Sequence, residues 1–364
     1  MKKQLVLVIS LAFSILTLGA CGSREKIVEV TRIAEVTRIV EVTVEPETPK
    51  ILERVRERGR LICGSDHDDP GFANLDKEGN TIGFDADLCR AVAAAVLGDA
   101  TAVDFISLES AQRGPALISG EIDLLARVAT WTSSRDVQWG DFTITMFYDG
   151  QGFLVPRDSG ITLLEELDGT TICVSAGGTT ESNLSNTFRQ RGLDYTPMLF
   201  RNGPDAIEVY KRGECDALTT DRSSLVARRS QLANPDAHII LAETISKEPL
   251  TPVVPSGDEQ WFDTVKIVMY VLINAEELGV TLENVDEMLN SDNIAIRRLL
   301  GVEQTFGQEE LGLDLDFAVD VLQAVGNYGE IYNRHFGPET DMALPRGLNN
   351  LWTNGGLIFA PPLK

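Results

Sequence analysis

Two stretches in different halves of the chain repeat the same pattern, and this repeat limits the folds that the sequence can adopt. Residues 119–125 read S-G-E-I-D-L-L, and residues 212–218 read R-G-E-C-D-A-L. Each stretch places a glycine at the end of a predicted helix and follows it with a short apolar strand. Ligands in open α/β sheets bind beyond the carboxyl ends of the strands. The repeat therefore predicts two α/β halves, in which residues 130–135 and 221 supply matching parts of one site.

The rest of the chain has the same α/β pattern of apolar periodicity. The expected helices are 51–58, 88–97, 112–119, 181–191 and 205–212, and the expected strands are 61–64, 103–106, 122–126, 171–174 and 215–218. Residues 148–156 and 239–250 are expected to form the two crossing strands of a hinge. After Trp261 the pattern becomes helical over 261–277, 294–300 and 315–325, with stops at Gly279, Gly301 and Gly326.

This order predicts a discontinuous first lobe. If the two crossing strands are a hinge, residues 151–245 form a second lobe that is inserted into the first. The first lobe then consists of residues 51–150 and 246–364, and its last part is a helical extension. A sensor domain of a signalling receptor would need a membrane-spanning helix after these lobes, and residues 251–364 predict none.

The N-terminus is typical of an exported protein. Lys2 and Lys3 precede an apolar run over residues 5–18. The run ends in L-G-A-C at 18–21, which resembles a bacterial lipobox, so we expect residues 1–20 to be a lipoprotein signal peptide and Cys21 to carry the lipid. An ordinary signal peptide with an incidental cysteine is the alternative. We expect the protein on the outer face of the cell membrane or in the periplasm.

Residues 21–50 are predicted to be a tether between the lipid and the lobes. They repeat E-V-T-R-I-A, E-V-T-R-I-V and E-V-T-V-E, and they end near Pro46 and Pro49. Low complexity and proline favour an extended segment, although the alternating β-branched residues would also suit a strand paired with another chain.

Charge and motif content exclude several functions. The net charge is −23, and phosphate binding needs clustered Lys and Arg, so nucleic acid is not an expected partner. The three histidines (His67, His238 and His335) and the absence of a C-x-x-C pair predict no metal site, and no nucleotide-binding or hydrolase motif predicts a cofactor or a nucleophile.

Four cysteines remain once Cys21 is assigned to lipid, and an even count in an exported chain predicts disulfides. Three pairings are possible. We favour Cys63 with Cys89 and Cys173 with Cys215, because these bridges stay within one lobe and leave the lobes free to move.

Four stretches carry the expected ligand chemistry. They are G-F-D-A-D-L (83–88), T-W-T-S-S-R-D (130–136), G-G-T-T-E (177–181) and C-D-A-L-T-T-D (215–221). Together they offer an arginine, a helix N-terminus with free N–H groups and a carboxylate. A guanidinium and backbone N–H groups bind a carboxylate, and an acidic group binds an ammonium. The expected ligand is an amino acid zwitterion.

The chain also resembles the amino-acid-binding proteins of ABC transporters, most closely the general L-amino-acid-binding group of solute-binding family 3. The motifs that carry the resemblance are I-C-V (172–174), G-E-C-D-A-L-T-T-D (213–221), I-S-K-E-P-L-T-P-V-V (245–254), Q-W-F-D (260–263), N-A-E-E-L-G (274–279), A-V-G-N-Y-G-E (324–330) and R-G-L-N-N-L-W (346–352). The resemblance implies a two-lobed periplasmic-binding-protein fold, with a mixed sheet flanked by helices in each lobe. It also implies a monomer that binds an L-amino acid between the lobes and delivers it to permease subunits.

The resemblance further implies roles for individual residues. Arg135 would bind the α-carboxylate and Thr130 the ammonium, because they have the spacing of the family's clamp. Thr179, with Gly178 and Thr180 at a helix start, would donate to the same carboxylate, and Asp221 would accept from the ammonium. The alternatives are a surface ion pair of Arg135 with Asp136, a plain helix cap at Thr179 and a solvated turn at Asp221.

Residues that would set ligand preference give opposing indications. Asp66, Asp68 and Asp69 would favour ligands with donor-rich side chains, unless this loop faces solvent. Arg127 would favour acidic or amide ligands. Trp131 would pack on an aliphatic side chain or in the core.

We do not expect an enzyme, although some relatives of this fold are dehydratases or lyases. Such an activity would use a carboxylate in the cleft as a general acid or base, and Glu109 or Glu181 would be the candidate.

Overall fold

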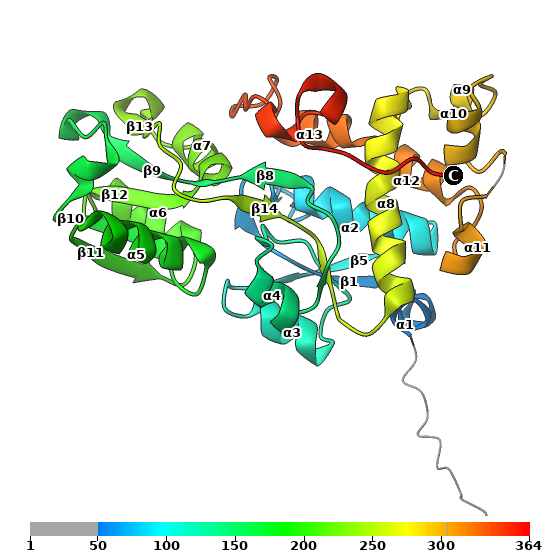
Figure 1. Ribbon diagram of the computed structural model, residues 1–364, viewed down its shortest axis with the longest axis horizontal. Coiled ribbons are helices and arrows are strands. Elements are labelled where there is room, and N and C mark those ends of the chain that lie inside the picture. Colours follow the sequence, from blue (N-terminus) through cyan, green and yellow to red (C-terminus); the bar gives the residue numbers. More distant parts are fainter. Residues whose placement is uncertain (1–49, 304) are drawn as a thin grey trace, which may run out of the picture. The chain divides into compact units, whose positions relative to one another are not determined.

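A computed structural model describes residues 50–303 and 305–364. The predicted signal peptide, the predicted lipid site at Cys21 and the predicted tether up to residue 49 lie outside the described residues. The described chain contains two five-stranded sheets with a two-stranded ribbon between them (Figure 1), and a small three-stranded sheet. Each of the larger sheets is flanked by helices, which confirms the predicted two-lobed α/β fold class.

The sheet of the first lobe draws its strands from both sides of the inserted segment. Its order is β5 (Val103–Ser107), β1 (Leu61–Ser65), β6 (Leu124–Leu125), β15 (Val253–Val254) and β7 (Asp141–Phe142). β1 runs parallel to β5 and β6, whereas β15 pairs antiparallel with β6 and β7. Because β1, β5 and β6 are parallel, their carboxyl ends meet at one edge of the sheet.

The sheet of the second lobe has a similar arrangement. Its order is β11 (Tyr195–Phe200), β10 (Thr170–Ser175), β12 (Ala217–Asp221), β9 (Gln151–Pro156) and β13 (His238–Ile240). β10 is parallel to β11 and β12, and the long strand β9 is antiparallel to its neighbours. The sequence did not predict β11. This strand contains Pro197 and forms one edge of the sheet, where a residue without an N–H is tolerated.

The connection between the lobes is the two-stranded ribbon. β8 (Phe147–Asp149) leads out of the first lobe, and β14 (Glu248–Leu250) returns to it, pairing antiparallel with β8. Figure 1 shows both strands passing between the two sheets. They fall within the segments that were predicted to cross at a hinge.

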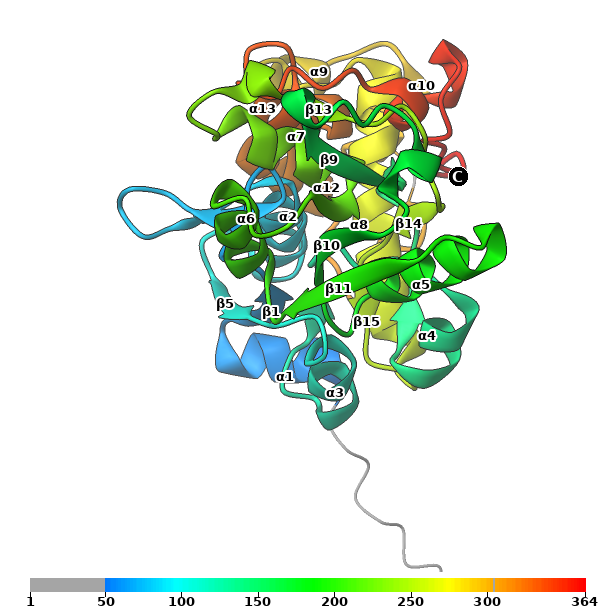
Figure 2. The ribbon, with the colours of Figure 1, turned by 90° about the vertical axis from the view of Figure 1, so that its left-hand side faces the viewer.

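Helices cover both sheets, and the view in Figure 2 looks onto the second lobe. α2 (Phe84–Leu97) and α3 (Arg113–Ser119) contact strands of the first sheet, and α5 (Thr179–Arg191), α6 (Gly203–Lys211) and α7 (Arg222–Ser230) contact strands of the second. The remaining elements are α1 (Ile51–Arg58), β2 (Asp68–Asp69), β3 (Ala73–Leu75), β4 (Thr81–Ile82), α4 (Ser133–Gln138), α8 (Glu259–Leu278), α9 (Val285–Met288), α10 (Ile294–Leu299), α11 (Gln308–Leu311), α12 (Phe317–Val325) and α13 (Tyr328–Phe336).

The C-terminal helices belong to the core of the first lobe. α12 packs on α2, and α13 packs on α2 and α8. Their buried side chains join one hydrophobic cluster with those of β1 and α2. Phe72, Phe84, Phe147 and Phe336 form its aromatic centre through edge-on and tilted ring contacts. Such contacts favour one arrangement of the rings, so the extension is an integral part of the lobe.

Two disulfides lie within single lobes. Cys63 on β1 is joined to Cys89 on α2, and Cys173 on β10 is joined to Cys215 just before β12, which is the pairing favoured from the sequence. The bridges span 26 and 42 residues, and closing loops of this size stabilises a fold by about 3–4 kcal/mol in the chain-entropy account. Across residues 50–303 and 305–364, no helix combines the length and the apolar composition needed to cross a membrane.

Candidate functional site

A polar cavity lies where the carboxyl ends of the strands of the two lobes face each other. It encloses about 570 Å³ of empty space, its opening to solvent included. First-lobe residues that line it are Asp66, Asp69, Ser110, Arg113, Arg127, Val128 and Thr130, and second-lobe residues are Ser175, Gly178, Thr179, Thr180, Asn202, Gly203, Thr220, Asp221, Ser224 and Arg228. Eight of the ten residues predicted to bind ligand line this cavity.

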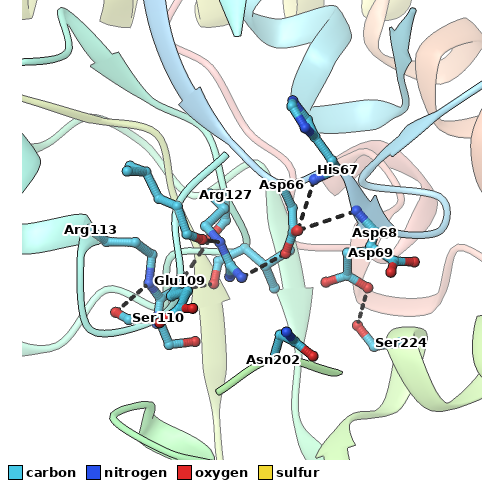
Figure 3. Close-up of polar contacts among 12 residues, drawn as sticks. Asp66, His67, Asp68, Asp69, Glu109, Ser110, Arg113, Arg127, Asn202 and Ser224 are labelled. Carbon is cyan, nitrogen blue, oxygen red and sulfur yellow. Dashed lines mark hydrogen bonds and ion pairs between the residues drawn. The ribbon is translucent and has the colours of Figure 1, made fainter. Parts of the chain in front are cut away.

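The charged residues with opposing indications for ligand preference are paired in the structure. Arg127 forms an ion pair with Asp66 at 2.6 Å between Nη2 and Oδ2. Asp69 accepts a hydrogen bond of 3.0 Å from Ser224 Oγ and lies 4.0 Å from the Arg228 guanidinium. Figure 3 shows the Asp66–Arg127 pair and the contact of Asp69 with Ser224. Arg127 and Asp69 therefore each have a polar partner within the described chain, although burial still raises the pKa of Asp69 to about 6.

Arg113 is a lining residue that the sequence analysis missed. It is only 4% exposed, and its hydrogen bonds go to the backbone carbonyls of Ser110, Arg127 and Val128 at 3.1–3.3 Å. Among the described residues, no carboxylate lies within 4.0 Å of its guanidinium. Burial lowers its pKa well below the usual value, and the nearby Arg127 and Arg135 lower it further. An anion in the cavity would compensate this charge.

Arg135 and Trp131, which were predicted to touch the ligand, are absent from the lining. Arg135 lies on α4, donates from Nη1 to the Thr130 carbonyl at 3.0 Å and stacks on the Trp139 ring at 4.4 Å. It makes no ion pair with Asp136, since no carboxylate of the described chain lies within 4.0 Å of it. Trp131 is 38% exposed and stacks on Phe142. In this structure, therefore, both side chains support the segment that carries Thr130.

The second lobe contributes a helix start. Gly178 is the N-cap of α5, and it supplies no side-chain cap. Thr179 and Thr180 follow in the first turn, where backbone N–H groups have no acceptor within the helix. The α5 N-terminus faces the cavity through these three residues, so it offers donors and a favourable dipole to an anion.

Asp221 ends β12 and faces the cavity from the same lobe. It is 6% exposed, and its Oδ1 has no hydrogen-bond partner in the described structure. Burial raises its pKa well above the usual value, and the carboxylates of Asp149 and Glu248 raise it further. A cationic group in the cavity would supply the missing partner and favour the charged carboxylate.

The turn between Arg127 and Thr130 is held in a strained conformation. Val128 has a φ of 41°, which a β-branched residue rarely adopts. Its N–H donates to Asp85 Oδ2 at 2.8 Å, and its carbonyl accepts from Arg113 at 3.1 Å. Asp85 belongs to the G-F-D-A-D-L motif at the start of α2, and burial raises its pKa to about 7. The motif therefore shapes the site without lining it.

Glu248 is a second residue that the sequence analysis missed. It lies on β14, is 1% exposed and accepts hydrogen bonds from four side chains. Two of the donors are the hydroxyls of the lining residues Thr130 and Thr179. The sequence separations are 118 and 69 residues, so no local pattern could have revealed these contacts.

The candidate catalytic carboxylates do not reach the cavity. Glu109 is exposed, and Glu181 accepts the Gly177 N–H at 2.8 Å; neither lines the cavity. Within the described part of the chain, no group of three or more His, Cys, Asp or Glu side chains is arranged to hold a metal ion.

Residues 61–338 match the family described as bacterial extracellular solute-binding proteins, family 3. The chain belongs to this family. The solute-binding protein is 48% identical over 315 residues to the general L-amino acid-binding periplasmic protein AapJ of Rhizobium johnstonii, covering 86% of this chain and 92% of AapJ. It is 46% identical over 315 residues to the glutamate/glutamine/aspartate/asparagine-binding protein BztA of Rhodobacter capsulatus, covering 86% and 93%.

A solved structure shares the fold over nearly the same length. The ABC transporter/periplasmic binding protein of Brucella ovis, solved with glutathione bound, is 45% identical to this solute-binding protein. The superposition has a TM-score of 0.84 and covers 87% of this chain and all of the other. AapJ and BztA are named as binding proteins, and the Brucella ovis protein as an ABC transporter/periplasmic binding protein.

Proposed function

We propose that this protein captures L-amino acids between its two lobes and delivers them to an ABC importer. The observation that carries the proposal is a pair of unmatched charges on opposite walls of the cavity. Within the described chain, Arg113 on the first lobe has no carboxylate within 4.0 Å, and Asp221 on the second has an oxygen without a donor. An amino acid zwitterion supplies one anion and one cation in a single small molecule.

The ligand carboxylate lies, in this proposal, between the first-lobe arginines and the N-terminus of α5. Arg113 faces the cavity directly, and Arg135 stands behind the Thr130 carbonyl. Rotation of the Arg135 side chain away from Trp139 would bring it to the carboxylate, as the family resemblance implies. Gly178, Thr179 and Thr180 supply backbone donors from the other lobe, and Asp221 accepts from the ammonium.

Closure of the lobes then depends on the ligand. Residues 151–245 move as one lobe relative to 51–150 and 246–364, with β8 and β14 as the hinge. An isolated cation and an isolated carboxylate are costly to bury, and the ligand compensates both only when the walls meet. Because the ligand contacts both charges only in the closed state, its binding shifts the population toward that state.

The proposal includes a lipid anchor at Cys21 and a tether over residues 21–50, which place the lobes near a membrane permease. Labelling of the full chain in bacteria with an alkyne fatty acid tests the anchor. Cys21→Ser should lose the label, and Ser23→Ala, which changes a neighbouring hydroxyl, should keep it. A label that persists in Cys21→Ser would contradict the anchor.

A thermal-unfolding panel over the twenty L-amino acids tests the capture itself, using the full chain in detergent. A ligand that binds only the native state at 100 times its Kd raises the unfolding free energy by about 2.7 kcal/mol. We expect a rise in Tm with several amino acids and their recovery unaltered after long incubation. Failure of all twenty to raise Tm would refute the function, and turnover of a bound amino acid would indicate an enzyme.

A further inference from the structure

Glu248 connects the hinge to both walls of the cavity. Its Oε2 accepts from Thr130 Oγ1 at 2.6 Å and from Thr179 Oγ1 at 3.0 Å. Its Oε1 accepts from Asn183 Nδ2 at 2.7 Å and from Ser246 Oγ at 2.5 Å. No Lys, Arg or His of the described chain lies within 4.0 Å of this buried carboxylate, so neutral donors alone satisfy it.

The two threonines come from different lobes. Thr130 is fixed to β14 through a bridge with Leu250 and through the hydrogen bond from Trp131 N to the Pro249 carbonyl at 2.8 Å. Thr179 and Asn183 lie on the first turns of α5 in the second lobe. The hydroxyl oxygens of the two threonines lie 3.4 Å apart. Glu248 thus brings together one hydroxyl from each wall.

The direction of these hydrogen bonds decides what the hydroxyls offer to a ligand. A threonine hydroxyl has one proton and two lone pairs. Both hydroxyls donate to Glu248 Oε2, so their protons point toward this oxygen. Toward the cavity, Thr130 and Thr179 therefore present lone pairs, which accept hydrogen bonds from an ammonium and repel a carboxylate.

We propose that Glu248 is a positioning residue that turns the Thr130 and Thr179 hydroxyls into acceptors for the ligand ammonium and ties α5 to the hinge. The proposal rests on the proposed amino acid capture. It assigns Thr179 two separate tasks, with its backbone N–H directed to the carboxylate and its hydroxyl to the ammonium. The expectation that the Thr179 hydroxyl donates to the carboxylate is thereby replaced.

A pair of probes that differ only in the ammonium tests this assignment. L-Glutamate and glutarate carry the same two carboxylates, and glutarate lacks the α-ammonium. In Glu248→Gln an amide nitrogen replaces one oxygen and donates to a hydroxyl, whose proton then turns toward the cavity. Calorimetric titration should show affinity for L-glutamate reduced about tenfold or more, with affinity for glutarate unchanged within about twofold.

Ser246→Ala is the matched control, because it removes a donor of the same carboxylate and leaves both threonines in place. It should leave the ratio of the two affinities unchanged, and thermal unfolding checks that each variant is folded. An equal loss of both affinities in Glu248→Gln would indicate a merely structural role and overturn the proposal. Unchanged affinities would overturn it as well.

A ligand-free measurement separates this inference from the proposed function. If wild-type protein binds no amino acid, the proposed function fails and the ammonium assignment fails with it. Hydrogen exchange then decides whether Glu248 ties α5 to the hinge. In Glu248→Ala, exchange of the helix-bonded amides over residues 183–188 should rise about tenfold, and in Ser246→Ala it should not. Exchange unchanged in Glu248→Ala would overturn the tie between α5 and the hinge.

Discussion

Each wall of the cavity holds one unmatched charge, positive on the first lobe and negative on the second, and the two walls hold these charges in different ways. On the first lobe, Arg113 is fixed by three backbone carbonyls, which orient the guanidinium without neutralising it. On the second lobe, one oxygen of Asp221 has no donor among the described residues, and burial raises the pKa of this carboxyl. The other charged lining residues form pairs, Arg127 with Asp66 and Arg228 with Asp69.

Under the proposed function, this difference predicts that one site accepts amino acids of several kinds. The unmatched charges correspond to the groups that all amino acids share, the carboxylate and the ammonium. The charges that would select particular side chains are paired with each other, Asp66 with Arg127 on the first lobe and Asp69 with Arg228 between the lobes. Each wall alone holds a charge without a partner. We therefore expect that loss of either unmatched charge weakens the binding of every amino acid.

Loss of the Asp221 charge on the second-lobe wall should have the largest effect on affinity. Asp221→Asn keeps the size of the side chain and removes its charge. A hydrogen bond between charged groups contributes about 1.5–3 kcal/mol, so affinity for L-amino acids should fall about 100-fold. Ligand-free protein should gain stability, since a buried carboxylate without a partner is removed. Calorimetric titration and thermal unfolding measure the two effects.

Asp194→Asn is the matched control for this change, because it removes the same charge from an exposed position on the same lobe. Its affinity should equal that of the wild type. If Asp221→Asn binds amino acids as tightly as Asp194→Asn does, the ammonium has been assigned to the wrong wall.

Replacement of Arg113 on the first-lobe wall should have the next largest effect on affinity. Arg113→Lys keeps a positive charge but loses the planar fork that holds a carboxylate with two N–H groups. We expect affinity to fall about 30-fold, equivalent to about 2 kcal/mol, for neutral and acidic amino acids alike. Arg189→Lys, on the exposed side of α5, is the control.

Arg135→Lys sharpens this prediction, since Arg135 is the arginine that the family resemblance assigns to the carboxylate. If only Arg135→Lys weakens binding, the side chain rotates into the cavity when a ligand is present. If only Arg113→Lys weakens binding, the anion-binding group is Arg113, which already faces the cavity in this structure. If Arg113→Lys weakens the binding of acidic amino acids alone, Arg113 contacts the ligand side chain instead of its α-carboxylate.

The contrast between the walls also shows what the sequence could reveal. Thr130, Gly178 and Asp221 lie three or four residues beyond the ends of predicted strands, so the topology of parallel strands placed them at one edge. Arg113 begins the short helix α3 and precedes no strand end, so its sequence position gave no sign that it faces the cavity. The pairing of Asp66 with Arg127 depends on contacts between distant segments, which no local pattern contains.

Acidification should weaken binding through the second wall. The pKa of Asp221 is raised by burial and by Asp149 and Glu248, while Arg113 opposes the shift. An ammonium ligand favours the carboxylate, so binding below the raised pKa must release a proton. We expect affinity to fall by up to about tenfold per pH unit there. Calorimetry in buffers of different ionisation enthalpy should detect the proton, and Asp221→Asn should lose both the release and the pH dependence.

Stability of the ligand-free protein should change with pH in the opposite direction. A carboxyl whose folded pKa is raised contributes stability below its unfolded pKa, and this contribution is lost as the pH rises through the folded pKa. The unfolding free energy should therefore fall on alkalisation in the wild type and fall less in Asp221→Asn. Equal slopes for the two proteins would show that Asp221 is not the titrating group.

The smallest effect is expected where the two walls touch without a ligand. Ser224 Oγ on α7 donates to Asp69 Oδ1 on the first lobe, and the Arg228 guanidinium donates to the Asp68 carbonyl at 3.2 Å. These contacts form only when the lobes meet, so Ser224→Ala should speed ligand release about threefold to fivefold and leave the association rate unchanged.

Ser230→Ala provides the control, because Ser230 lies at the other end of α7 and donates within its own helix to the Ala227 carbonyl. Stopped-flow kinetics with any amino acid that the panel identifies would compare the two variants. Equal release rates would mean that the ligand alone holds the walls together. Slower association in Ser224→Ala would instead mean that this contact forms before the ligand is enclosed, since only interactions present in the transition state for binding affect the rate of entry.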